Sequence, residues 1–216
     1  MIHTCPQRAW YVDEYLIPSL VEQGIKNIIV YNDVNGEGQL TSLMKSYEYT
    51  NDKDTWHLQD DVIISSRFKE LTEIHNDGVV CGFCNGFSSA QPGKTNVFSM
   101  WYSMPCIRIP GHIFRNFVFW LDTLDTKRRY GNFIETGKHD DVLFQYFMQE
   151  NYNREPILNL APNIVNHIDH LIGGSILNKA RDKELSFVMA KYWDEPDLVI
   201  DIEQRLKKGG HNNETD

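Results

Sequence analysis

The chain has 216 residues, of which 41% are hydrophobic and 24% charged, a composition typical of a soluble globular protein that can bury a sizeable core. Its formal net charge is −9, so the protein as a whole should be repelled by phosphate backbones, and we do not expect nonspecific nucleic-acid binding. The sequence contains neither an apolar run of 18 residues nor an N-terminal signal pattern, which predicts a cytoplasmic protein without a membrane span.

Extended and helical patterns alternate in the first third of the chain. Residues Ile2–Cys5 and Lys26–Asp33 have the β-branched or short apolar character of strands, and each is followed by a helical pattern, over Trp10–Gln23 and Leu40–Tyr47. A third extended run, Trp56–Val62, contains two adjacent carboxylates. This order predicts an α/β fold with parallel strands.

The remaining segments are predicted with mixed patterns and belong to the same single domain, residues 1–206. In chain order we expect a helix over Ser66–Ile74, a strand over Val79–Phe83, a loop over Gly86–Asn96, strands within Val97–Ile109, a helix over His112–Thr123, a loop over Gly131–His139, a helix from Asp140 to Met148, extended segments over Leu158–Ala161 and Pro162–Ile168, and a last helix over Lys183–Tyr192. Residues 207–216 are polar and are predicted to be disordered.

Polar side chains stand near the ends of the first three predicted strands. Thr4, Asp33 and Asp61 each lie at such an end, and in parallel sheets ligands bind at the carboxyl ends of strands. The adjacent carboxylates Asp60 and Asp61 can hold a hard divalent cation against phosphate oxygens. A metal-dependent nucleotide site is therefore the leading hypothesis, and a solvated turn is the structural alternative.

A second acidic pair, Asp140 and Asp141, opens a predicted helix. Acidic residues in a first turn complement the helix dipole and cap free amides, which would explain both without any function. A carboxylate in this place can also remove the proton from an acceptor hydroxyl. Both interpretations stay open for each residue.

Taken together, these motifs resemble glycosyltransferases of the GT-A fold, in particular small bacterial or phage members that use nucleotide-diphosphate sugars. The segment Gln59–Val62 is similar to the aspartate motif of that family, with Gln59 in place of the usual first acid. The resemblance implies that Asp61 binds the metal and that Asp60, together with Gln59, contacts the ribose or sugar.

Three further segments extend the resemblance over about residues 1–178. Gly137–Phe144 is similar to the segment that carries the acceptor base of inverting members, here Asp141 or Asp140. Pro162–Ile168 is similar to a late segment that supplies a histidine to the metal or diphosphate, here His167. Cys5–Arg8 resembles the start of the nucleotide site, where Thr4, Arg8 and Asp33 would contact base, ribose or diphosphate. Without the family, Arg8 and His167 have structural explanations, and Asp33 equally suits a turn.

The resemblance implies a Rossmann-like three-layer sandwich with a mixed central sheet. It further implies a hexosyltransferase-like enzyme that uses Mn²⁺ or Mg²⁺ and transfers a sugar from a UDP-sugar to an acceptor hydroxyl, with inversion as the expected outcome and retention as the open alternative. The acceptor class is open: a glycan, a protein, a small molecule or a modified nucleobase.

Three alternatives come from other classes. A nucleotidyltransferase would also use carboxylates and a metal, but the turn after the first strand, Cys5–Arg8, lacks the glycine-rich phosphate loop typical of that class. The run His167–His170 suggests a metallohydrolase, although the sequence offers no further histidine-rich segment to complete its ligands. A module that binds sugar nucleotides without catalysis is the third alternative.

Overall fold

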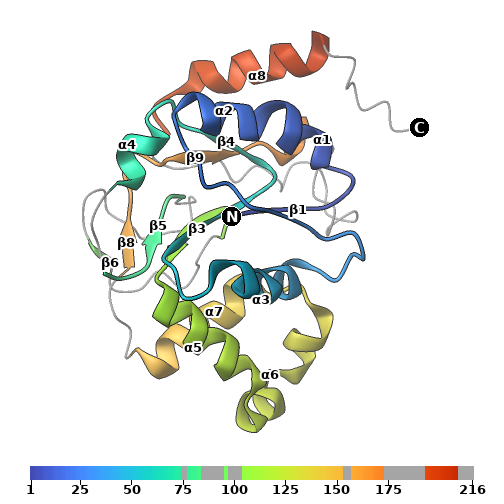
Figure 1. Cartoon of the computed structure of the whole chain (residues 1–216), viewed down its shortest axis with the longest axis vertical. Helices are drawn as coiled ribbons and strands as arrows, with labels where there is room; N and C mark the ends of the chain where they lie inside the picture. The colour runs from blue at the N-terminus through green and yellow to red at the C-terminus, as the bar shows by residue number, and fades with distance from the viewer. Residues whose placement is uncertain (74–76, 84–94, 97–103, 153–156, 173–192, 209–216) are drawn as a thin grey trace.

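A computed structural model describes residues 1–73, 77–83, 95–96, 104–152, 157–172 and 193–208. Its elements follow one another as β1 (Ile2–Thr4), α1 (Ala9–Tyr11), η1 (Val12–Leu16), α2 (Ile17–Glu22), β2 (Val30–Asn32), α3 (Gln39–Thr50), β3 (Thr55–Gln59), β4 (Val62–Ile64), α4 (Phe68–Thr72), β5 (Val80–Cys81), β6 (Thr95–Asn96), β7 (Cys106–Ile109), α5 (Gly111–Asp122), α6 (Leu124–Thr136), α7 (Asp140–Asn151), β8 (Ile157–Asn159), β9 (Val165–His167), η2 (Asp169–Leu171) and α8 (Pro196–Lys208). Figure 1 shows their arrangement.

The central sheet is mixed and has the strand order β2-β1-β3-β7-β5-β8-β6. Strand β1 pairs in parallel with β2 and with β3, whereas β7 runs antiparallel to both of its neighbours, β3 and β5. The predicted α/β class and mixed central sheet are confirmed. The parallel group β2-β1-β3 places three carboxyl ends at one edge, where the sequence puts its polar residues.

Helices cover both faces of the sheet (Figure 1). Helices α1, α2 and α8 lie on one side, and α3, α5, α6 and α7 lie on the other. Among the described residues, no helix has both the length and the apolar character needed to cross a bilayer.

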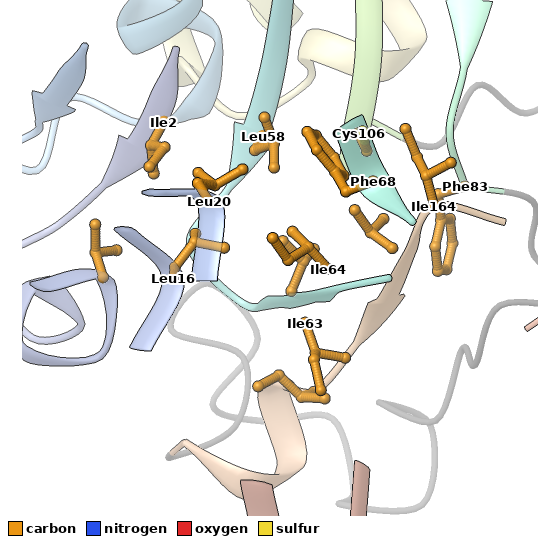
Figure 2. Packing of buried hydrophobic residues seen from close by; sticks show 14 of the residues in the cluster. Ile2, Leu16, Leu20, Leu58, Ile63, Ile64, Phe68, Phe83, Cys106 and Ile164 are labelled. Atoms are coloured by element: carbon orange, nitrogen blue, oxygen red, sulfur yellow. The ribbon is translucent and has the colours of Figure 1, made fainter. Parts of the chain in front are cut away.

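Two hydrophobic clusters fill the spaces on either side of the sheet. Strand side chains alternate between them: Cys106 belongs to the first cluster and its neighbour Ile107 to the second. In the first cluster, Ile2 and Leu58 of adjacent strands lie beside Leu20 of the overlying helix (Figure 2). Burial of this apolar surface is the main force that holds the helices on the sheet.

The predicted helix over Trp10–Gln23 is confirmed as one continuous helical segment. It runs through α1, the π-helical turn η1 and α2, and it ends before Gly24, whose positive φ of 78° suits glycine. The Tyr11 hydroxyl, in the first turn, donates a 2.9 Å hydrogen bond to the carbonyl of Val62. This bond ties the start of the helix to the start of β4.

The predicted loop over Gly131–His139 is wrong for most of its length, because Leu124–Thr136 forms helix α6. The side chain of Thr123 caps this helix by accepting from the amide of Thr126, and Arg129 forms ion pairs with Asp125 and with Glu150. A glycine inside a helix costs only about 1 kcal/mol relative to alanine, which these contacts outweigh at Gly131. The helix ends at Gly137, which has a φ of 66°.

Other boundaries differ from the predictions in smaller ways. Strand β2 occupies only Val30–Asn32 of the predicted Lys26–Asp33 and is largely exposed, because it is an edge strand. Lys207 and Lys208, predicted as disordered tail, form the last turn of α8, a helix that the sequence analysis did not predict. The predicted helix over Lys183–Tyr192 lies outside the described residues, as does most of the predicted loop Gly86–Asn96.

A separate two-stranded sheet joins β4 to β9 in antiparallel orientation. Its register pairs Val62 with His167, and the amide of Ile168 donates a 2.8 Å hydrogen bond to the carbonyl of Asp61. Strand β4 begins directly after the two adjacent carboxylates. This pairing therefore brings a histidine from late in the chain to the acidic pair.

Candidate functional site

A cavity of about 260 Å³ lies at the carboxyl ends of β1, β2 and β3. The lining includes all six residues that the sequence analysis assigns to nucleotide and sugar binding or to the metal carboxylate, namely Thr4, Arg8, Asp33, Gln59, Asp60 and Asp61. The β2–α3 connection and the start of α3 form the opposite wall, with Gly36, Gly38, Gln39 and Ser42. The predicted carboxylates thus face a concave space between the sheet edge and α3.

Strand register explains why these residues meet. Thr4 is the Cα partner of Asn32 in the parallel β1–β2 ladder, and the amide of Asp33 donates a 2.8 Å hydrogen bond to the carbonyl of Thr4. On the other side of β1, His3 is in register with Gln59, the last residue of β3. Three consecutive strand ends are therefore level at one edge, as expected for parallel strands.

Asp33 anchors the loop that forms one wall of the cavity. Its Oδ1 accepts a 2.9 Å hydrogen bond from the amide of Glu37, and its Oδ2 accepts a 2.8 Å hydrogen bond from the amide of Gly38. An aspartate that caps free amides in this way fixes the loop ahead of a helix. The turn interpretation of Asp33 is thus observed, and its contact with a nucleotide stays a prediction.

Arg8 lies between the two carboxylates at the cavity floor. Its Nη1 is 2.9 Å from Asp60 Oδ1 and 2.6 Å from Asp61 Oδ2, and all three side chains are nearly buried. The residue stands at the N-cap of α1, four residues after the end of β1. One guanidinium nitrogen thus bridges both carboxylates. Hydrogen bonds between charged groups are stronger than neutral ones, so this bridge holds the three side chains together.

His167 approaches Asp61 from β9. Its Nε2 is 3.1 Å from Asp61 Oδ2, while its Nδ1 is 3.5 Å from Asp169 Oδ1 on the opposite side of the ring. Asp169 lies in the short helix η2 and is itself 3.9 Å from Nδ1 of His170. Asp169 Oδ1 accepts no hydrogen bond from the described residues, so Asp169 contributes a negative charge beside the His167 imidazole.

These contacts set the protonation states of the acidic pair. Burial opposes ionisation of Asp61, but the neighbouring His167 and Arg8 outweigh it and hold the pKa of Asp61 below its usual value. For Asp60, burial and the charge of Asp61 raise the pKa. Burial would lower the pKa of His167, but attraction to Asp61 raises it. Asp61 is therefore the more strongly ionised of the two acids.

The donor atoms around Asp61 fit a divalent cation. Two ligands at right angles on an octahedral Mg²⁺ lie about 3 Å apart, because each is about 2.1 Å from the ion. In the free protein His167 Nε2 and Asp61 Oδ2 are 3.1 Å apart as a hydrogen-bonded ion pair, so His167 would have to lose its proton before both groups could bind one cation; Asp61 Oδ1 has no hydrogen-bond partner among the described residues. A carboxylate and an imidazole are both ligands of Mn²⁺-type ions.

The described residues contain no group of three or more His, Cys, Asp and Glu side chains that could hold a metal ion by themselves. A cation in nucleotide sites commonly has one or two protein ligands, and substrate phosphates complete its coordination. Asp61 and His167 therefore suit a cation that arrives with a nucleotide rather than one resident in the free protein.

Asp140 and Asp141 occupy the first turn of α7 and do not belong to the cavity lining. Asp140 is buried, and desolvation, with a contribution from Asp141, raises its pKa to about 7. Asp141 is less buried, its Oδ1 accepts a 2.8 Å hydrogen bond from the amide of Val142, and burial raises its pKa. Asp140 thus has a pKa suited to proton transfer near neutral pH, but it lies outside the cavity lining.

A histidine pair at the cavity, in which His3 is half-buried and His57 is buried, was not predicted from the sequence. His3 Nε2 and His57 Nδ1 are 3.0 Å apart on the adjacent strands β1 and β3, and His3 also lines the cavity. Burial lowers the pKa of His3 to about 3 and that of His57 well below its usual value. The sequence signal that could have indicated this pair was a histidine within each of two predicted strands, His3 and His57, and these strands are neighbours in the sheet. Asp169 was likewise missed as a partner of His167.

Replacing both His3 and His57 by leucine should make the protein less sensitive to acid. Because the folded-state pKa values lie below the unfolded value of 6.5, the unfolded chain binds more protons as the pH falls below 6.5. Below pH 6.5, each histidine then lowers the free energy of unfolding by up to about 1.4 kcal/mol for every unit by which the pH falls. Urea unfolding at pH 7.5 and pH 5.0 measures the difference.

The exposed His112→Gln variant is the control, and it should lose stability on acidification as the wild type does. An equal loss in the double leucine variant and in the wild type would show that the pair is not the acid-sensitive element.

No protein-family model matches this sequence, and no curated protein matches it. The function of the site must therefore be argued from the residues and geometry described above.

Proposed function

We propose that this protein is a cytoplasmic, metal-dependent glycosyltransferase of the GT-A type that transfers a sugar from a UDP-sugar to an acceptor hydroxyl. The observation that carries the proposal is the cavity at three parallel strand ends, with the buried acidic pair Asp60 and Asp61 at its floor and His167 beside Asp61. Nucleotides in α/β folds bind at this edge of a sheet. The position of the carboxylates agrees with the resemblance of Gln59–Val62 to the aspartate motif.

The cavity size supports a nucleoside as the occupant of its inner part. Small-molecule sites commonly have volumes of about 300–1000 Å³, and this cavity of about 260 Å³ is slightly smaller than that range, which suits part of a ligand rather than a whole sugar nucleotide. Gly36 and Gly38 line the loop wall and place no side chain in the cavity. In this proposal the base and ribose enter between Thr4 and the loop, and the diphosphate extends toward Asp61.

Each residue then has a defined part in the reaction. Asp61 and His167 would hold Mn²⁺ or Mg²⁺, and that cation, when bound, stabilises the negative charge on the departing diphosphate. Asp60 and Gln59 would contact the ribose or sugar, and the carboxylate of Asp169 lies beside the His167 ring. Asp140 or Asp141 would remove the acceptor proton as the hydroxyl attacks the anomeric carbon.

The alternatives are less well supported by the same residues. The turn between β1 and α1 contains no glycine, so it cannot form the phosphate loop of a nucleotidyltransferase. A metallohydrolase needs a protein-held metal, and the described residues contain no group of three ligands for it. A binding module without catalysis shares the cavity and differs only in turnover.

Titration of UDP into the protein by calorimetry, with Mn²⁺ and again with EDTA, tests the proposal. We expect binding that requires the metal, because only two protein ligands face the cation and phosphates must supply others. Binding that is equal in EDTA would contradict a metal-dependent donor site. Absence of binding to UDP and to every other nucleoside diphosphate in both conditions would contradict the proposed function.

A further inference from the structure

The guanidinium of Arg8 lies where a divalent cation would have to meet the acidic pair. Asp61 Oδ2 is 2.6 Å from Arg8 Nη1 and 3.1 Å from His167 Nε2, so this one oxygen faces both a fixed positive charge and a metal-type ligand. The Arg8 side chain is only 6% exposed, and Asp60 and Asp61 are its ionic partners at the cavity floor. A cation at Asp61 and a guanidinium at the same oxygen would repel each other strongly.

We propose that Arg8 and the divalent cation exchange places during nucleotide binding. In the free protein Arg8 pairs with Asp60 and Asp61; when a nucleoside diphosphate enters, the cation takes Asp61 and Arg8 turns to the phosphate oxygens. This inference rests on the proposed function and adds to it the order of events. It makes Arg8 a competitor of the metal before the nucleotide binds and a ligand of the nucleotide afterwards.

The position of Arg8 permits this exchange with little change of the backbone. Its backbone is held by the start of α1, where its carbonyl accepts a 3.0 Å hydrogen bond from the amide of Tyr11. Its side chain lines the same cavity as Thr4 and Gln7, so a rotation of the side chain keeps it at the ligand. The planar guanidinium presents paired donors that match phosphate oxygens as well as carboxylates.

The opposite interpretation is that Arg8 is a permanent structural partner of the acidic pair. The two interpretations predict opposite effects when Arg8 is removed. A competitor masks the metal ligands, so its loss should strengthen metal binding in the absence of nucleotide. A structural partner keeps Asp60 and Asp61 in place, so its loss should weaken metal binding or leave it unchanged.

The experiment compares Mn²⁺ binding to the wild type and to Arg8→Gln without nucleotide, using the electron paramagnetic resonance signal of free Mn²⁺. We expect the variant to bind Mn²⁺ at least tenfold more tightly. With saturating Mn²⁺, the same variant should bind UDP at least tenfold more weakly, because the diphosphate loses its guanidinium partner. Arg115→Gln, which removes an exposed arginine paired with Asp52, is the matched control and should change neither affinity.

Loss of a buried positive charge can also unfold the variant, and this outcome is informative. Arg8→Gln should then melt below the wild type in EDTA, and Mn²⁺ should raise its melting temperature by more than it raises that of the wild type. Equal or weaker Mn²⁺ binding by the folded variant, or failure of Mn²⁺ to restore an unfolded one, would overturn the exchange.

Binding of UDP by the wild-type protein in Mn²⁺ tests the proposed function separately from the exchange. If the wild-type protein shows no Mn²⁺-dependent binding of UDP, both the donor site and the exchange are overturned. If it does bind UDP with Mn²⁺ and Arg8→Gln gains no affinity for Mn²⁺, only the exchange is overturned.

Discussion

Asp61→Asn is expected to abolish the metal-dependent part of UDP binding, with at least a hundredfold loss of affinity in Mn²⁺. The carboxylate is the strongest ligand available to the cation, since the charges of Arg8 and His167 keep its pKa low and the group ionised. An amide retains the shape but removes the charge, so a divalent cation gains much less from it. Calorimetric titration of UDP in Mn²⁺ and in EDTA should give the same weak affinity for this variant.

Two matched substitutions make the Asp61 result specific. Asp60→Asn removes the neighbouring acid, whose pKa is raised by burial and by Asp61, and should weaken UDP binding while keeping its metal dependence. Asp13→Asn, on the exposed side of the first helical segment, should bind as the wild type does. Circular dichroism checks folding, because breaking a buried ion pair costs about 3–5 kcal/mol. Undiminished metal-dependent binding by a folded Asp61→Asn would remove the central claim.

Asp141→Asn and Asp140→Asn should separate donor binding from catalysis. Neither residue lines the cavity, so both variants should bind UDP within a few-fold of the wild type. The variant that lacks the base should lose sugar transfer by about 10²–10⁴-fold, the usual contribution of general base catalysis. UDP release from a panel of UDP-sugars, with a screen of acceptors, is the measurement. Full activity of both variants would exclude this helix as the source of the base.

The stability of Asp140→Asn shows whether burial sets the pKa of Asp140. Its folded-state pKa of about 7 lies above the unfolded value of 3.8, so the native protein favours the protonated acid and loses stability as the pH rises from 3.8 to 7. Asparagine does not ionise. The variant should therefore gain up to about 4 kcal/mol relative to the wild type between pH 4 and pH 8. If the difference in unfolding free energy between variant and wild type is the same at pH 4 and pH 8, burial does not raise the pKa of Asp140.

Local patterns were sufficient to predict which residues meet at the cavity at the sheet edge. Each of the first strands is short, is followed by a helical pattern and ends near a polar residue, so sequence order alone placed Thr4, Asp33 and the acidic pair at one sheet edge. The prediction holds because β2, β1 and β3 are parallel, and neighbouring parallel strands have their carboxyl ends at the same edge of the sheet. Nothing beyond the residue pattern and this rule was needed.

Contacts between distant segments could not be derived in the same way. The approach of His167 to Asp61 depends on the register of β4 with β9, which no local pattern specifies; only the resemblance of Pro162–Ile168 indicated it. The bridge from Arg8 to both carboxylates depends on where the first helix begins. The predicted loop at Gly131 was wrong because helix α6, which Thr123 caps, continues through that glycine to Thr136.

The β4–β9 pairing also has a consequence for synthesis. A nascent chain emerging from the ribosome can assemble β1, β3 and the Arg8 bridge early, because domains form from the N-terminus as residues appear. Asp61 receives its imidazole only after His167 has been translated and β9 has paired with β4. Until then Arg8 is paired with the two carboxylates, and its single positive charge offsets only one of their two possible negative charges.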